Sequence, residues 1–247
     1  MASRSPPQTL SSCSTTIRHA TARSHRFLRA AAVLGLCGIL STPAFADGPG
    51  RGLTAQFERD YLTFIIDHHT SALRMTELAA GTDAQRDAAI NNPQEGTSPT
   101  PNTTPTPPKA GIEHIKSIAR MANRMQREEI AMAQRFLREW YGINHTPQVR
   151  PEGQQQIQLL EQTPAGAQFE QTFLEVFSSH HYAALHPSMD CKVKADLQHH
   201  QLQDYCDGIV HAQAREISEM RELLCNQFSI CDYQPTTGIR GQRSSNQ

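Results

Sequence analysis

Apolar residues recur along most of the chain at intervals of three and four, the spacing that places them on one face of an α-helix. Four long stripes of this kind predict helices over residues 54–80, 112–141, 163–186 and 194–227. Thr54 is a candidate N-cap, and Gly81, Gly142 and Pro187 follow the first three stripes as expected of helix stop signals. A weaker pattern favours a short helix over residues 154–161.

The first and third stripes each contain a pair of adjacent histidines. His68 and His69 lie inside an apolar run over residues 64–75, and His180 and His181 lie in a similar run 112 residues later. His68 falls on the apolar stripe itself, so we expect it to face inward with His69 beside it at the edge of the stripe. A recurrence of this kind implies a duplicated helical unit.

The second and fourth stripes correspond in the same way. Residues 126–130 (Gln-Arg-Glu-Glu-Ile) match residues 213–217 (Gln-Ala-Arg-Glu-Ile) at a spacing of 87. The pattern therefore predicts an all-α protein, an antiparallel four-helix bundle made of two repeated helix hairpins over residues 53–142 and 164–233.

Residues 91–109 interrupt the first hairpin. This insert is rich in Pro, Thr, Asn and Ser and contains no His, Cys or Met. Such a composition is typical of a solvated, mobile loop, and a spacer is expected here rather than a binding site.

The first 46 residues differ in composition from the rest of the chain. They carry five arginines and no acidic residue, followed by an apolar run of about 11 residues and the sequence Ala44-Phe45-Ala46. This pattern predicts a signal peptide over residues 1–46, followed by a single domain over 47–247. The run is too short to span a bilayer as a helix, so no stable membrane anchor is expected after cleavage.

Removal of the leader changes both charge and cysteine content. Without its five arginines, 18 basic residues stand against 24 acidic ones, a formal net charge near −6, and nucleic acid is not an expected partner. Four cysteines remain, and an exported context favours two disulfides. Three pairings are open. Cys225 with Cys231 is plausible locally, whereas Cys206 and Cys225 would be too far apart on one helix.

Imidazole and thioether side chains on the inner face of a bundle suit a soft or borderline metal, copper above all. If the first hairpin closed directly, His68 would lie level with a position between Met121 and Met125 on the second helix. Met75 is two turns from His68, too far for one ion to use both without other helices. A site containing thioethers would favour Cu(I) or Ag(I).

The same reasoning in the second hairpin places His180 and His181 level with His199 and His200. A cluster of four imidazoles would favour Cu(II), Zn(II) or Ni(II). The structural alternative is that the methionines fill gaps in the core and that each histidine pair is a polar residue with an exposed neighbour.

The sequence also resembles a bacterial exported family labelled a domain of unknown function. The resemblance rests on a helix with His-His-x-x-Ala followed by Met, and on a second helix with Gln-x-x-Glu-Ile-x-x-Met. The matching stretches are residues 57–77, 118–140, 166–185 and 205–231. The resemblance implies a ferritin-like four-helix fold, and some cyanobacterial members are periplasmic copper-binding proteins used in copper tolerance.

An enzyme is not expected. A di-iron centre in a ferritin-like bundle needs Glu-x-x-His pairs, and the chain contains none. The sequence contains no nucleophile elbow of a Ser/His/Asp hydrolase either.

We expect a periplasmic or secreted protein that sequesters or transfers copper, with Cu(I) preferred, Cu(II) possible and Ag(I) as a mimic. Its partners would be the ion and a copper donor or acceptor protein. The alternative is a non-metal helical interaction or structural module of the cell envelope. The candidate metal ligands are His68, His69, Met75, Met121, Met125, His180, His181, His199 and His200.

Overall fold

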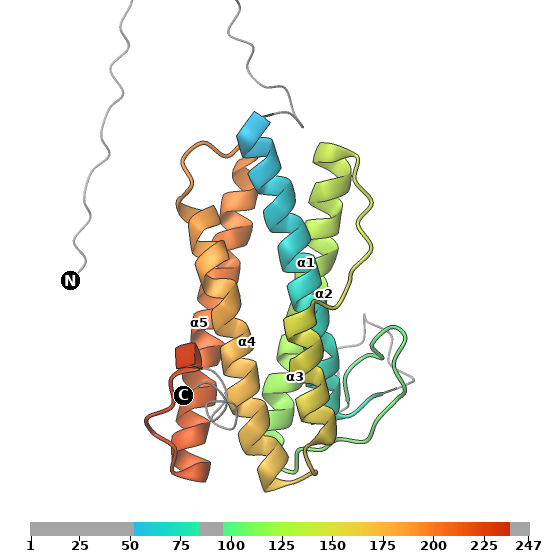
Figure 1. The fold of residues 1–247 in the computed structure, drawn as a ribbon, viewed down its shortest axis with the longest axis vertical. Helices are drawn as coiled ribbons and strands as arrows, with labels where there is room; N and C mark the ends of the chain where they lie inside the picture. The colour runs from blue at the N-terminus through green and yellow to red at the C-terminus, as the bar shows by residue number, and fades with distance from the viewer. Residues whose placement is uncertain (1–51, 84–95, 238–247) are drawn as a thin grey trace, which may run out of the picture. The chain divides into compact units, whose positions relative to one another are not determined.

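The computed structural model describes residues 52–83 and 96–237, and these are helical apart from loops and one isolated bridge between Thr82 and Thr97 (Figure 1). The elements are α1 (Gly52–Ala80), α2 (Glu113–Tyr141), α3 (Pro151–Gln162), α4 (Ala167–Val193), α5 (His200–Phe228) and a 3₁₀ turn η1 (Pro235–Thr237). The predicted signal peptide, residues 1–46, and the first residues of the insert, 91–95, lie outside the described ranges.

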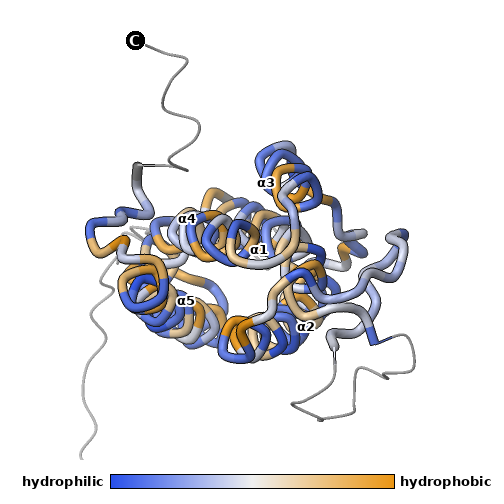
Figure 2. Tube along the Cα trace, turned by 90° about the horizontal axis from the view of Figure 1, so that it is seen from below, coloured by the Kyte–Doolittle hydropathy of each residue, from blue (hydrophilic) through white to orange (hydrophobic). Residues whose placement is uncertain are grey.

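The four long helices run side by side, and α1 packs mainly against α2 while α4 packs mainly against α5 (Figure 1). Contacts between α1 and α4 join the two pairs, and the short α3 packs on α1 and α4. In the view along the helices, α3 lies outside the group formed by the four long helices (Figure 2). Each predicted hairpin is therefore a pair of neighbouring helices.

The core consists of two apolar clusters at different heights. One contains Met75, Phe173 and Met220, and the other contains Ile65 and Ile209. Between these clusters every long helix contributes two polar residues, which we call the polar layer: His68 and His69, Gln126 and Glu129, His180 and His181, Gln213 and Glu216. Seven of the eight are buried, and Glu129 is partly buried.

Two glycines end their helices for clear conformational reasons. Gly142 has φ 67°, and its amide donates to the Arg138 carbonyl in a left-handed C-cap. Gly81 has φ +82°, and a Cβ there would lie 2.7 Å from the Pro108 ring. Both predicted stops are confirmed. The predicted N-cap is not, because α1 begins at Gly52 and the Thr54 hydroxyl donates to Asp196.

Pro187 does not end the third long helix, as the sequence had predicted. It lies inside α4, which continues to Val193, and α5 begins only at His200. The extra turns are held by tertiary contacts: the Tyr61 and Ser188 hydroxyls are 3.0 Å apart, and Cys191 is bonded to Cys206 of α5. These contacts outweigh the amide hydrogen bond that a helical proline removes.

The described part of the insert, residues 96–109, is a loop without helix or strand as predicted, but it is not wholly solvated. Thr97 and Thr100 are buried, and the segment folds over the end of α1. The fully buried Glu77 carboxylate accepts hydrogen bonds from the Thr82 and Thr103 hydroxyls and pairs with Arg74. Side chains of the helices therefore order this segment despite its loop-like composition.

The four cysteines of the domain form two disulfides, Cys191–Cys206 and Cys225–Cys231. Two bridges had been expected, with Cys225–Cys231 among the open pairings. Disulfides are typical of an oxidising compartment. None of the helices in the described ranges is long and apolar enough to cross a membrane.

Candidate metal centre

Each helix pair places one histidine of the polar layer against a glutamate. In the α4–α5 pair, His181 Nε2 lies 2.7 Å from Glu216 Oε2 in a hydrogen bond. In the α1–α2 pair, His69 Nε2 lies 2.9 Å from Glu129 Oε2, a contact with the distance but not the angle of a hydrogen bond. Both histidines are fully buried. The sequence repeat therefore gives the same His–Glu pairing in both halves.

The other two histidines of the layer meet each other. His68 and His180 stack with ring centroids 3.8 Å apart, and His68 Nε2 donates to the His180 carbonyl at 3.1 Å. His180 Nδ1 lies 2.9 Å from Gln156 Oε1 of α3, so the short helix covers this side of the layer. The structure thus brings His68, His69, His180 and His181 into one buried region.

Burial sets the charge of the stacked rings. Desolvation, together with the imidazoles of His69 and His181, holds the pKa of His68 well below its ordinary value. Desolvation lowers the pKa of His180 in the same way, and the nearby His68 carbonyl offsets only part of the effect. Both rings are therefore neutral at pH 7, which is the form that binds metals.

Several ligand atoms in the layer are buried without a hydrogen-bond partner among the described residues. They include Nδ1 of His69 and the equivalent Nδ1 of His181. Both amide atoms of Gln126 and Oε1 of Gln213 are also without one. Unpaired buried polar atoms are uncommon in folded proteins, and a ligand is one of the few explanations for them.

The layer is not a finished coordination sphere. Within the described ranges, no group of three or more His, Cys, Asp and Glu side chains is arranged to hold a metal ion. The donor chemistry nevertheless fits a borderline metal, because imidazoles with free ring nitrogens lie beside carboxylates. Binding would require side-chain rotation to turn these nitrogens toward one ion.

The methionines do not lie where the sequence had placed them. Met121 is 46 % exposed, and Met75 is fully buried in an apolar cluster. Met125 lines a pocket between α2 and α5. The residue level with the histidine pair of α1 is Glu129, about one turn beyond Met125, because α2 extends past the end of α1. The expected placement of His68 between Met121 and Met125 was therefore wrong.

The expected cluster of His180 and His181 with His199 and His200 is also wrong. His199 lies just before α5, where its Nδ1 is 2.6 Å from Glu58 Oε2 and its ring stacks on Trp140. His200 is exposed. The error follows from Pro187: because α4 is about two turns longer than predicted, His181 lies level with Glu216 instead.

Sequence reasoning missed the carboxylates and amides of the layer. The signal was present in the repeat Gln126-x-x-Glu129 and Gln213-x-x-Glu216, which is spaced to place both side chains on one helix face. The same repeat that relates the two hairpins thus also marks the glutamates that contact His69 and His181.

Fold and site together define a helical protein with a duplicated layer of buried histidines, glutamates and glutamines. Residues 104–224 match the family described as "Domain of unknown function (DUF305)". The matched region includes the polar residues that α2, α4 and α5 contribute to the layer, and it agrees with the resemblance drawn from the sequence. Residues 57–77 of α1 lie outside the matched region. No curated protein and no solved structure gave a significant match to the chain.

Proposed function

We propose that this is an exported copper-binding protein that sequesters or transfers the ion and contributes to copper tolerance. The observation that carries the proposal is the pair of buried imidazoles, His69 and His181, each with a free Nδ1 and each beside a glutamate. Imidazole nitrogens of this kind suit copper, and their duplication is hard to account for by packing alone.

We further infer that the four long helices form an antiparallel bundle of the ferritin-like type built from two repeated hairpins. The pairing of α1 with α2 and of α4 with α5 supports this arrangement, as does the equivalence of the two His–Glu contacts. In such a bundle the interior holds metal ligands from facing helices. The polar layer occupies that interior position.

A periplasmic or secreted location belongs to the same proposal. Two disulfides and the arginine-rich leader of the sequence support export. Outside the cytoplasm, a protein that buffers copper would take the ion from one carrier and pass it to another, so a copper donor or acceptor protein is the expected partner.

The donor set differs from the one suggested by the sequence. The thioethers of Met121 and Met125 are not next to the histidine pair, so imidazole and carboxylate groups supply the proposed buried site. Such groups accept Cu(II) as well as Cu(I), and Ag(I) serves as a redox-inert mimic of Cu(I). Without an adjacent thioether, the preference for Cu(I) depends on burial and on the neutral rings.

One observation favours the alternative, a helical structural or interaction module without metal. His181 and Glu216 already form a hydrogen bond, and His68 and His180 are stacked with polar partners. A satisfied polar network of this kind can serve only to align helices. The two functions make opposite predictions for metal binding.

Titration of the full chain with Cu(I), Ag(I), Cu(II) and Zn(II) separates them. We expect binding of Cu(I) in competition with a chromogenic chelator, with a stoichiometry that falls when His69 and His181 are both replaced by glutamine. Binding no tighter than that of an unrelated helical protein would overturn the copper proposal and leave the structural module.

A further inference from the structure

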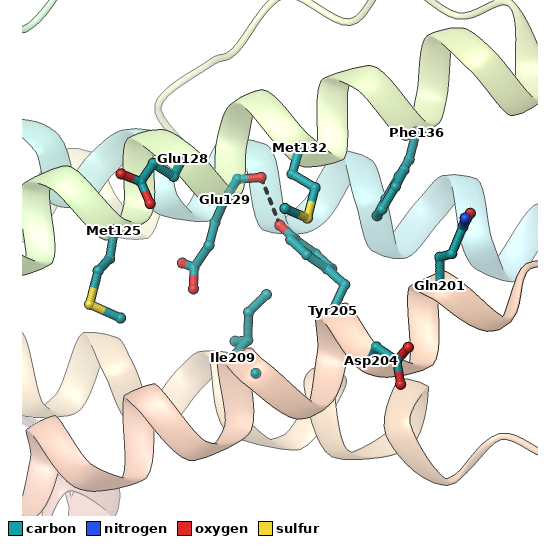
Figure 3. A pocket seen from close by; sticks show the side chains of 10 residues that line it. Met125, Glu128, Glu129, Met132, Phe136, Gln201, Asp204, Tyr205 and Ile209 are labelled. Carbon is teal, nitrogen blue, oxygen red and sulfur yellow. Dashed lines mark hydrogen bonds between the residues drawn. The ribbon is translucent and has the colours of Figure 1, made fainter. Parts of the chain in front are cut away.

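A pocket of about 480 Å³ lies between α2 and α5 on one side of the polar layer (Figure 3). Its lining comes from two helices only: Met125, Glu128, Glu129, Met132 and Phe136 of α2, and Gln201, Asp204, Tyr205, Gly208 and Ile209 of α5. Glu128, Asp204 and Gly208 are exposed, whereas Tyr205 and Ile209 are buried. The pocket therefore leads from solvent toward the interior.

The chemistry of the pocket changes with depth. The exposed carboxylates Glu128 and Asp204 attract cations, and the thioethers of Met125 and Met132 are soft donors exposed to the same space (Figure 3). Soft sulfur ligands select Cu(I) and Ag(I) over the hard cations that carboxylates alone would admit. The carboxylates of the pocket therefore attract cations in general, and its thioethers favour soft cations among them.

The inner wall of the pocket contacts the polar layer through Glu129. Its carboxylate lines the pocket, and Oε2 lies 2.9 Å from Nε2 of the fully buried His69. The Tyr205 hydroxyl donates to the Glu129 carbonyl at 2.9 Å, which fixes this part of α2 against α5 (Figure 3). One carboxylate therefore connects the pocket to a buried imidazole.

The groups at this junction are unusually free. Both ring nitrogens of His69, Oε2 of Glu129 and both amide atoms of Gln126 are buried and make no hydrogen bond with any described residue. Gln126 is only 2 % exposed. In the second half, His181 Nε2 and Glu216 Oε2 are hydrogen-bonded to each other, and only Nδ1 of His181 is left without a partner. The half that faces the pocket therefore has one more unpaired ring nitrogen, and its glutamate also has an unpaired oxygen.

Gly208 keeps the pocket open. It lies in the middle of α5, where glycine costs about 1 kcal/mol relative to alanine. Neither backbone nor packing requires it, because its φ is not positive and a Cβ there would meet nothing within 4 Å. The space that its missing side chain leaves belongs to the pocket.

We infer that this pocket is the access chamber through which a soft metal ion reaches the buried histidines, with Met125 and Met132 as transient ligands and Glu129 as the group that passes the ion to His69. This inference rests on the copper-binding function proposed above. It adds the path by which the metal ion enters the protein: from the pocket between α2 and α5 to His69 in the first hairpin.

The transfer consists of ligand exchange alone. An ion held by a thioether gains Glu129 and then a ring nitrogen of His69 as ligands while the sulfur leaves, and no electron is transferred. The chamber should therefore control how fast the ion loads, while the buried donors set how tightly it is held.

The test compares Gly208→Phe with Gly208→Ala in the full chain. The phenylalanine ring fills the chamber, whereas alanine also raises the helix propensity of this position but leaves the chamber open. We expect Cu(I) transfer from a chromogenic chelator, followed by stopped-flow absorbance, to be at least about tenfold slower in Gly208→Phe. The equilibrium affinity should stay within about twofold of the wild type in both variants.

A second variant keeps the proposal testable if Gly208→Phe fails to fold. Met125→Leu with Met132→Leu conserves side-chain volume and removes both sulfurs, so loading should slow while helicity and affinity are retained. Wild-type loading rates in both the Gly208→Phe and the double leucine variants would overturn the chamber but leave copper binding intact. If the wild type itself binds no Cu(I), the proposed function fails and the chamber with it.

Discussion

His68 and His180 stack face to face, with ring centroids 3.8 Å apart and ring planes within 5° of parallel. They are 112 residues apart and occupy equivalent positions in the two halves of the sequence. The two helix pairs therefore meet in the polar layer through equivalent residues of the repeat, and each pair also contains its own His–Glu contact there.

The lowered pKa values of these two rings predict a loss of stability in mild acid. The folded protein keeps both rings neutral, whereas the unfolded chain takes up protons below about pH 6.5. The contribution of these two rings to the free energy of unfolding is therefore fully present above that pH. It decreases as the pH falls from about 6.5 toward the lowered pKa values that the rings have in the folded protein. Each ring contributes roughly 1.4 kcal/mol per pH unit to the slope.

Urea unfolding at pH 7.5 and pH 5.5, monitored by circular dichroism, measures this loss. A His68→Phe variant, which keeps a flat ring in the stack, should show a shallower dependence on pH. An identical slope in the variant and the wild type would contradict the assignment.

Replacing His69 and His181 with glutamine tests whether these two side chains are the copper ligands. Glutamine at position 181 still donates a hydrogen bond to Glu216, so the helices should remain paired. Affinity for Cu(I) should fall by roughly 100-fold or more, because both free ring nitrogens are lost. Competition with a chelator gives the affinity, and far-ultraviolet circular dichroism checks the helices. Met121→Leu is the control, since this side chain is 46 % exposed and should not matter.

The disulfide Cys191–Cys206 should stabilise the fold by about 3 kcal/mol, because it closes a 15-residue separation. Replacing both cysteines with serine should also loosen the turns of α4 after Pro187, which the bond ties to α5. Hydrogen exchange over residues 188–193 would report that loosening. The matched control removes Cys225–Cys231, whose separation of 6 residues should make the loss of stability smaller.

The buried carboxylate of Glu77 organises the segment over the end of α1. Glu77→Ala should cost about 3–5 kcal/mol, because Arg74 loses its buried partner and two threonine hydroxyls lose their acceptor. Glu161 pairs with the same arginine from a side chain that is 42 % exposed, so Glu161→Ala should cost about 1 kcal/mol or less. Urea titrations of the two variants measure the free energy of unfolding. Equal losses of this free energy would show that the burial of Glu77 does not explain its contribution to stability.

Local sequence signals were enough for the helices whose ends depend on local chemistry. The residues of α1 and α2 were predicted to within two positions, because Gly81 and Gly142 supply left-handed caps that need no distant partner. Pro187 misled the prediction, because the contacts that extend α4 past it come from Tyr61 and from a disulfide. Nothing in the neighbouring sequence reports such contacts.

The candidate site was harder to predict because it depends on alignment between helices. The histidine pairs were found from their repetition. The apolar stripe predicted the burial of His68 but placed His69 at its edge, whereas His69 is fully buried. Which residue faces His69 depends on how far α2 extends beyond α1, and that is set by the ordered segment 96–109. A composition typical of loops gave no measure of this offset, so Met125 was expected where Glu129 lies.

The position of the polar layer between two apolar clusters limits how the helices can slide past one another. A displacement of any long helix by one turn, about 5.4 Å, would press imidazoles or glutamates against phenylalanine and isoleucine side chains. Each such misplacement leaves a desolvated polar group without compensation, at a cost of several kcal/mol. The layer thus selects one alignment from several that would bury similar apolar area.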